Sequence, residues 1–162
     1  MIKGYSKDAL PKADLYVIGN ALSRGNECVE FILDAKLPFK SGPQMLGDIL
    51  KEKRVFAVSG THGKTTTSSM IGTMLEEAGY DPTLVVGGLV SNLNSNVKLG
   101  SGDVIVVEAD EYDRSFLALN PTIAVVTNLE LEHTDCYSDF EDLETAFLQY
   151  CNSVPFYGEV IL

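Results

Sequence analysis

One stretch constrains this chain more than any other. A β-prone run at residues 55–58 leads into a Gly-rich turn that ends in Gly63-Lys64-Thr65, and a helix-compatible pattern follows. This order of strand, loop and helix is typical of a phosphate-binding loop. Glycines let the backbone approach an anion closely, and the amides at a helix N-terminus point partial positive charge at it. We therefore predict a nucleotide-binding loop made of Gly60, Thr61, His62, Gly63, Lys64, Thr65 and Thr66.

The spacing within this loop departs from the general rule. The usual pattern has a longer spacer between its first glycine and the Gly-Lys pair, whereas only Thr61 and His62 lie there in this chain. The alternative is an ordinary strand-to-helix turn with a surface lysine. The preceding buried-type strand and the triple threonine favour the phosphate loop, in which Lys64 would reach the β- and γ-phosphates and Thr65 would help to hold Mg²⁺.

Composition narrows the classes of function. The chain has 162 residues, 45% of them apolar, and a net charge of −11. Such a chain can build a real core, and its negative net charge argues against a nucleic-acid-binding surface, which would need a basic patch. Its three cysteines are scattered, which fits a reducing compartment. No signal peptide and no membrane-length apolar run are present, so we expect a soluble, cytoplasmic protein.

Strands alternate with helices along the chain, which predicts an α/β fold with a parallel, doubly wound sheet. The charged segment 51–54 is interpreted as a domain boundary. A strand at 14–18 and helices over 27–35 and 43–50 precede that boundary. After it we expect strands at 55–58, 84–86, 104–107, 123–127 and from 160, a turn at Gly87-Gly88, a polar loop at 91–96, and helices from the nucleotide loop to about 78 and over 139–150.

Acidic residues follow the apolar run 104–107. Ligands bind beyond the carboxyl ends of strands in open parallel sheets, so Glu108 would lie beside the nucleotide loop, where a carboxylate suits Mg²⁺. The neighbouring Asp110, Glu111 and Asp113 are equally compatible with a solvated turn.

Polar groups also follow the apolar run 123–127. His133 could be a ligand for a second metal ion or could orient a phosphate oxygen, with Asn128 and Asp135 around it. His62 is equally compatible with a spacer whose backbone matters more than its imidazole.

Three motifs occur in order at the ends of three successive predicted strands. They are Gly60-Thr-His-Gly-Lys-Thr-Thr-Thr67, Glu108-Ala-Asp-Glu111 and Asn128-Leu-Glu-Leu-Glu-His133. Together they resemble the Mur ligase family, and more narrowly its branch that uses UDP-N-acetylmuramate. The resemblance implies ATP-dependent, ADP-forming amide ligation through an acyl phosphate, in peptidoglycan synthesis. It implies that Lys64 binds the β- and γ-phosphates, that Thr65 and Glu108 hold one Mg²⁺ and His133 a second, and that Asn128, Gly87 and Gly88 lie near the muramoyl substrate.

The implied acceptor is divided between two activities. Residues 80–162 look most like members that add L-alanine to UDP-N-acetylmuramate. Residues 14–46 look more like members that add L-alanyl-γ-D-glutamyl-meso-diaminopimelate in cell-wall recycling. An insertion expected after Glu111-Tyr-Asp113 in the tripeptide-adding members is not found, and more of the chain favours L-alanine.

The chain also departs from the family pattern. No Gly-rich nucleotide-sugar loop precedes Asp14, and no lysine follows Lys98, which excludes the carbamylated lysine that some relatives use. We interpret residues 1–52 as the C-terminal part of the nucleotide-sugar-binding domain and residues 53–162 as an incomplete central ATP-binding domain. A fragment of this kind is expected to be inactive alone.

Two other functions compete with this interpretation. A P-loop module could bind nucleotide without ligating anything, but it has no evident need for both Glu108 and His133. Folylpolyglutamate synthase is a related ligase with a different substrate, and the Glu108-Ala-Asp-Glu111 stretch argues against it. The sequence does not indicate an oligomeric state.

Overall fold

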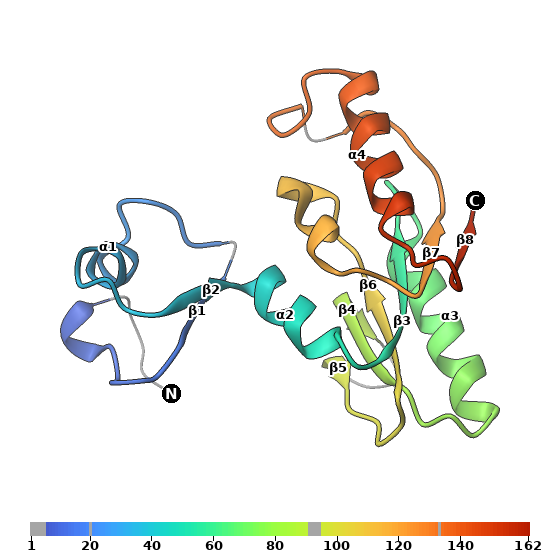
Figure 1. Ribbon diagram of the computed structural model, residues 1–162, viewed down its shortest axis with the longest axis horizontal. Coiled ribbons are helices and arrows are strands. Elements are labelled where there is room, and N and C mark those ends of the chain that lie inside the picture. Colours follow the sequence, from blue (N-terminus) through green and yellow to red (C-terminus); the bar gives the residue numbers. More distant parts are fainter. Residues whose placement is uncertain (1–5, 20, 91–94, 133) are drawn as a thin grey trace. The chain divides into compact units, whose positions relative to one another are not determined.

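The computed structural model describes residues 6–19, 21–90, 95–132 and 134–162. The chain forms two compact units, the first extending to Asp48 and the second starting at Ile49. Figure 1 shows the elements of each unit. The boundary of residues 52 and 53 predicted from the sequence lies close to this division. Among the described residues, no helix has both the length and the apolar character needed to cross a membrane.

The first unit is built around two short parallel strands. It contains the 3-10 helix η1 (Lys7–Ala9), strand β1 (Tyr16–Ile18), helix α1 (Glu27–Asp34) and strand β2 (Phe39–Ser41), with β1 paired to β2. Helix α1 begins where predicted, because the Asn26 side chain accepts hydrogen bonds from the Cys28 and Val29 amides. Helix α2 (Gly42–Leu50) then crosses the division between the units.

The second unit contains a six-stranded sheet in the order β5-β4-β6-β3-β7-β8. Its strands are β3 (Arg54–Ser59), β4 (Thr83–Val90), β5 (Ser95–Lys98), β6 (Val104–Glu108), β7 (Ile123–Val126) and β8 (Glu159–Ile161). All neighbouring pairs are parallel except β4 with β5, which is antiparallel. The α/β fold with a parallel sheet is thus confirmed, with an antiparallel strand at one edge.

Helices cover both faces of this sheet. Helix α3 (Lys64–Glu77) packs Ile71 and Leu75 against a buried cluster of Leu84, Val86 and Val106. The 3-10 helix η2 (Tyr112–Ala118) and helix α4 (Phe140–Asn152) pack together through Phe116, whose ring lies 5.0 Å from that of Tyr150. All four residues 104–107 are buried, so both faces of β6 are covered, as its unbroken apolar run predicted.

Two local predictions were wrong. The pair Gly87-Gly88 is not a turn: β4 continues through it to Val90. Glycine is permitted in a strand, and the pairing of β4 with β5 shifts register between Val85 and Val90, an irregularity that glycines accommodate. The predicted polar loop at 91–96 gives way to β5 from Ser95, and its residues 91–94 lie outside the described part of the chain.

Candidate functional site

The nucleotide loop follows the central strand of the sheet. Strand β3 pairs with β6 on one side and with β7 on the other. Since all three strands are parallel, their carboxyl ends lie along one edge of the sheet. The loop after β3 therefore lies between the segments that follow β6 and β7, which are the segments carrying the other two motifs.

Gly60 is required by a close approach of the β7 segment. Its φ is +127°, a region that side chains rarely adopt. A Cβ at this position would lie 2.2 Å from Thr127 Oγ1 and 2.8 Å from the Asn128 carbonyl oxygen. Gly63, with a φ of +82°, occupies the N-cap position of α3, and no side chain caps the helix there.

The β7 side of the loop, which we define as Thr127, Asn128 and Glu130, makes neutral hydrogen bonds to the loop, to the His62 backbone and to the Thr61 side chain. The Thr127 hydroxyl donates to the His62 carbonyl at 2.6 Å. The Asn128 side chain accepts from the His62 amide at 2.9 Å and donates to the His62 carbonyl at 3.3 Å. Asn128 thus holds the loop in shape, and its predicted contact with substrate stays a prediction.

Thr61 adds a second set of contacts on the β7 side. Its amide donates to the Asn128 carbonyl at 3.2 Å. Its hydroxyl accepts from the Glu130 amide at 2.8 Å and donates to the Glu130 carbonyl at 3.1 Å. Thr61 is nearly buried, so its side chain anchors the loop, while its backbone carbonyl faces Lys64.

The β6 side of the loop, which we define as Glu108 and Glu111, makes contacts through charged groups. The Thr65 hydroxyl donates to Glu108 Oε2 at 2.8 Å, and the Gly87 amide donates to the same oxygen at 2.8 Å. The Lys64 ammonium donates to both carboxylate oxygens of Glu111, at 2.9 and 3.1 Å. The structure therefore brings Lys64, Thr65, Glu108 and Gly87 together at one edge of the sheet.

The donor set at Thr65 and Glu108 suits a magnesium ion. A hydroxyl oxygen and a carboxylate oxygen lie 2.8 Å apart and half-buried, and Mg²⁺ prefers oxygen ligands of this kind. Among the described residues, no group of three or more His, Cys, Asp or Glu side chains could hold a metal by itself. In proteins, Mg²⁺ is usually bound through one or two protein ligands together with phosphate oxygens and water.

Other predicted residues lie around this centre. Thr66 is exposed in the first turn of α3, where backbone amides lack partners within the helix. Gly88 lies beside Thr65, because a Cβ on Gly88 would be 3.6 Å from Thr65 Cγ2. The His62 imidazole is more than half exposed, with Nε2 3.8 Å from a Glu130 oxygen and 3.7 Å from a Glu132 oxygen. His133 and the side chain of Asp113 lie outside the described part of the chain.

Sequence reasoning missed the position of Glu111. We treated it as equally compatible with a solvated turn, yet only 3% of the residue is exposed. A strongly buried carboxylate needs a partner, and Lys64 supplies one. The sequence carries no local signal that separates Glu111 from the neighbouring Asp110 and Asp113.

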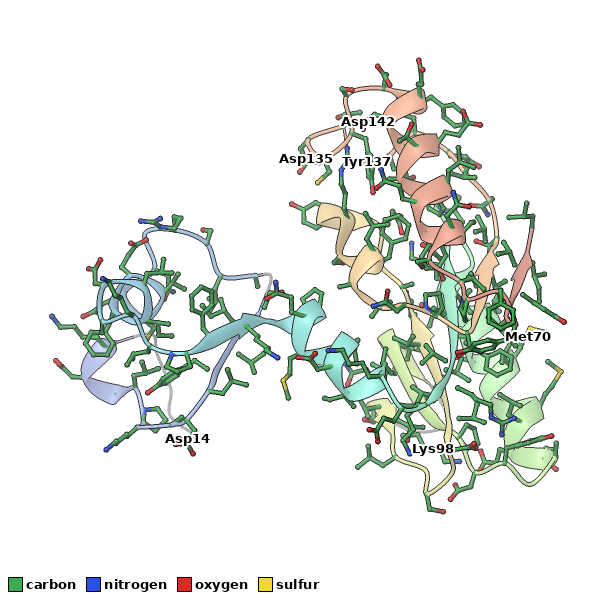
Figure 2. The ribbon with its side chains drawn as sticks, in the orientation of Figure 1. Asp14, Met70, Lys98, Asp135, Tyr137 and Asp142 are labelled. Carbon is green, nitrogen blue, oxygen red and sulfur yellow. The ribbon has the colours of Figure 1, made fainter. Side chains whose placement is uncertain are left out.

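Buried contacts behind the site hold Glu111 in place. The Tyr137 hydroxyl donates to the Glu111 carbonyl at 2.6 Å, and burial raises the pKa of Tyr137 to about 12. Arg114 lies 5.1 Å from the Tyr137 ring and donates two hydrogen bonds to Asp142. The hydrogen bond from Arg114 lowers the pKa of the Asp142 carboxyl. Figure 2 labels Tyr137 and Asp142 close to the beginning of α4.

Comparison with known proteins identifies relatives of the whole chain. The model of the Mur ligase middle domain matches residues 58–162. A UDP-N-acetylmuramate--L-alanine ligase of Myxococcus xanthus is 48% identical over 160 residues, which are 99% of this chain and 34% of that protein. A protein of the same name from Geotalea uraniireducens is 42% identical, over 98% of this chain and 35% of its own length. The chain thus spans about a third of these curated relatives.

Solved structures resemble both units. The UDP-N-acetylmuramate:L-alanyl-gamma-D-glutamyl-meso-diaminopimelate ligase of Neisseria meningitidis superposes with a TM-score of 0.88 at 37% identity, covering 98% of this chain and 55% of that one. The UDP-N-acetylmuramate-alanine ligase of Thermotoga maritima gives a TM-score of 0.84 at 28% identity, covering 94% of this chain and 36% of that one.

Proposed function

We propose that this chain, which belongs to the Mur ligase family, carries the ATP site of a ligase that joins UDP-N-acetylmuramate to L-alanine in peptidoglycan synthesis. The observation that carries the proposal is the arrangement of Lys64, Thr65 and Glu108 at the carboxyl ends of two paired parallel strands. A lysine and a Mg²⁺ site at the start of a helix are the groups that hold the β- and γ-phosphates of a nucleotide.

The chemistry explains why such a ligase needs this site. A carboxylate does not acylate an amine directly, because it has no good leaving group. Transfer of the γ-phosphoryl group breaks its bond to ADP and forms an acyl phosphate on the muramoyl carboxylate. The amine of the acceptor then attacks the carbonyl carbon, phosphate leaves, a proton is lost, and an amide remains.

The residues of this chain would position and neutralise the reacting groups. The Lys64 ammonium would donate to phosphate oxygens, as would amides of the loop and of the first turn of α3. Thr65 and Glu108 would hold Mg²⁺, which supplies positive charge to the phosphates when bound. The dense bonding of the β7 side to His62 and Thr61 supports this proposal, because electrostatic catalysis depends on groups that are already fixed.

We further propose roles for the parts that the geometry leaves open. Residues 1–52 would belong to a domain that binds the nucleotide sugar, and residues 53–162 to the central ATP-binding domain. His133 would hold a second Mg²⁺, and Asn128, Gly87 and Gly88 would lie near the muramoyl group. The protein would act in the cytoplasm, where ATP and UDP-sugars are found.

The acceptor remains the point on which two activities compete. The relatives at 48% and 42% identity are named as L-alanine ligases, and this favours L-alanine. The solved structure with a TM-score of 0.88 is a tripeptide ligase at 37% identity, and this favours the tripeptide. Phosphate release by a full-length ligase that contains this chain, measured with MgATP, UDP-N-acetylmuramate and each acceptor in turn, would separate them, because only the true acceptor supports turnover.

Nucleotide binding is the first test. Calorimetry with MgATP should detect binding by this chain, and Lys64→Ala should weaken it at least about tenfold, since hydrogen bonds to charged groups are worth that much. Lys53→Ala is the matched control, because Lys53 is exposed and its ammonium contacts the Gly102 carbonyl outside the site. Equal affinities for Lys64→Ala and the unmutated chain would show that the loop does not bind phosphate in the proposed way.

A further inference from the structure

The Lys64–Glu111 ion pair has no assigned role in the proposed reaction. Only 14% of the Lys64 side chain and 4% of the Glu111 side chain are exposed, and Nζ lies 2.9 Å from Glu111 Oε2. The Arg54–Asp103 pair, by contrast, lies at the surface, with side chains that are 55% and 64% exposed. Buried pairs are costly to break because each charge is left without compensation.

The hydrogen bonds of Lys64 account for all of its donors. A lysine ammonium has three hydrogens. Nζ lies 2.7 Å from the Gly60 carbonyl, 3.3 Å from the Thr61 carbonyl, and within 3.1 Å of both Glu111 oxygens. A phosphate oxygen can gain a hydrogen bond from Lys64 only if one of these acceptors gives one up.

Glu111 is the acceptor that an incoming phosphate would affect most. The two carbonyls are neutral and belong to the loop that cradles the phosphate, whereas Glu111 carries the same sign of charge as the ligand. Glu111 also cannot move away easily. It is the N-cap residue of η2, and its own carbonyl accepts hydrogen bonds from the buried Tyr137 hydroxyl at 2.6 Å and from the Arg114 amide at 3.0 Å.

From these contacts we infer that Glu111 is a positioning residue that occupies Lys64 before nucleotide binds and competes with the β- and γ-phosphates for it. The pair keeps the Lys64 ammonium beside the loop carbonyls, so the side chain is ordered before nucleotide binds. The same pair lowers the affinity of the site for polyphosphate ligands. This inference rests on the proposed function for the identity of the anion. It predicts that removing the charge of Glu111 strengthens binding of nucleotides that reach Lys64 and leaves AMP unaffected.

The test compares Glu111→Gln with the unmutated chain by calorimetry, using MgATP, MgADP and AMP. Glutamine keeps the size of the side chain and leaves the Tyr137 contact, which is to the backbone, in place. The expected result is a dissociation constant for MgATP that falls about tenfold, which is the size of a hydrogen bond to a charged group. The constant for AMP, which lacks the β- and γ-phosphates, should change less than about twofold.

Asp110→Asn is the matched control. Asp110 is exposed, one residue away, and its side chain accepts a hydrogen bond from the Tyr112 amide, as an asparagine can also do. It removes the same charge without touching Lys64, so it should change no affinity by more than about twofold. Unchanged or weaker MgATP binding by Glu111→Gln, or an equal gain for AMP, would overturn the inference.

A second measurement separates this inference from the proposed function. If neither the unmutated chain nor Glu111→Gln binds MgATP, the proposed nucleotide site is wrong. The Lys64 pair is then judged by the ¹³Cε and ¹⁵Nζ resonances of Lys64, assigned from their loss in Lys64→Ala. A shift of these resonances in Glu111→Gln, and none in Asp110→Asn, would support the pairing. Identical Lys64 resonances in the unmutated chain, Glu111→Gln and Asp110→Asn would overturn it.

Discussion

The two sides of the nucleotide loop are held by different chemistry. On the β7 side, Thr127 and Asn128 bind the His62 backbone and Glu130 binds the Thr61 side chain, all through neutral hydrogen bonds. On the β6 side, Glu108 and Glu111 bind it through carboxylates that contact Thr65 and Lys64. The β7 side therefore fixes the shape of the loop, and the β6 side supplies the charged groups of the site. Substitutions on the β7 side should therefore change folding stability first, and those on the β6 side should change ligand binding first.

The largest effect on shape is expected from Gly60→Ala. The new Cβ would meet Thr127 Oγ1 and the Asn128 carbonyl at a φ of +127°, so strain and overlap add to a loss of roughly 3–5 kcal/mol in the free energy of unfolding. Urea denaturation would measure it. Gly79→Ala is the control, because Gly79 also has a positive φ, of +83°, but nothing lies within 4 Å of the added Cβ. That control should lower the free energy of unfolding by only about 1 kcal/mol. Equal losses for Gly60→Ala and Gly79→Ala would show that the close contact with the β7 side does not require a glycine at position 60.

Among changes to the charged β6 side, the largest effect on ligand affinity is expected from Glu108→Gln. An amide oxygen can still accept the hydrogen bonds from Thr65 and Gly87, so the fold should be retained, but a neutral ligand holds Mg²⁺ less well. We expect the affinity for MgATP to fall roughly tenfold or more, and the affinity for ATP in EDTA to stay the same or rise. Calorimetry with and without Mg²⁺ would measure both. If Mg²⁺ strengthens ATP binding by Glu108→Gln as much as by the unmutated chain, Glu108 is not a ligand of the metal.

How much of this arrangement could be predicted depends on the range of the interactions. The order of strands and helices, and the position of Glu108 next to the nucleotide loop, follow from local pattern and from the rule for parallel sheets. The continuation of β4 through Gly87-Gly88 did not follow, because glycines usually signal turns, whereas here β4 pairs with β5 again beyond them, at Val90. The pairing of Lys64 with Glu111 joins residues 47 positions apart, and nothing local in the sequence distinguishes Glu111 from Asp110.

A smaller effect on shape is expected from Thr127→Val. The hydroxyl donates its one hydrogen to the His62 carbonyl at 2.6 Å, and the Ser59 carbonyl oxygen lies 3.3 Å from the same Oγ1. Valine has the same shape without the donor, so a loss of about 1–2 kcal/mol in stability is expected. Thr73→Val is the matched control, because Thr73 donates only within exposed α3, to the Ser69 carbonyl, and should cost less than about 0.5 kcal/mol. If both variants unfold at the same urea concentration, the β7 side does not stabilise the loop.

The smallest effect is expected from Tyr137→Phe, which tests the support behind the β6 side. At neutral pH the loss of the hydrogen bond to the Glu111 carbonyl should cost about 1 kcal/mol, because the Arg114 amide still donates to that carbonyl. The pKa of Tyr137 is raised by burial to about 12, above the value of about 10 for an unfolded tyrosine. Its contribution to stability is therefore complete below about pH 10 and is lost as the pH rises towards 12.

The difference in stability between the two proteins should consequently narrow from pH 9 to pH 11. Burial also raises the pKa of Tyr150, so both proteins should lose stability in alkali, but the unmutated chain should lose more. Urea denaturation at the two pH values would measure the difference, with Tyr157→Phe as a control because Tyr157 is 70% exposed. A constant difference across this range would mean that the Tyr137 hydroxyl is not buried against Glu111, and that the β6 side is held in place by the carboxylate contacts alone.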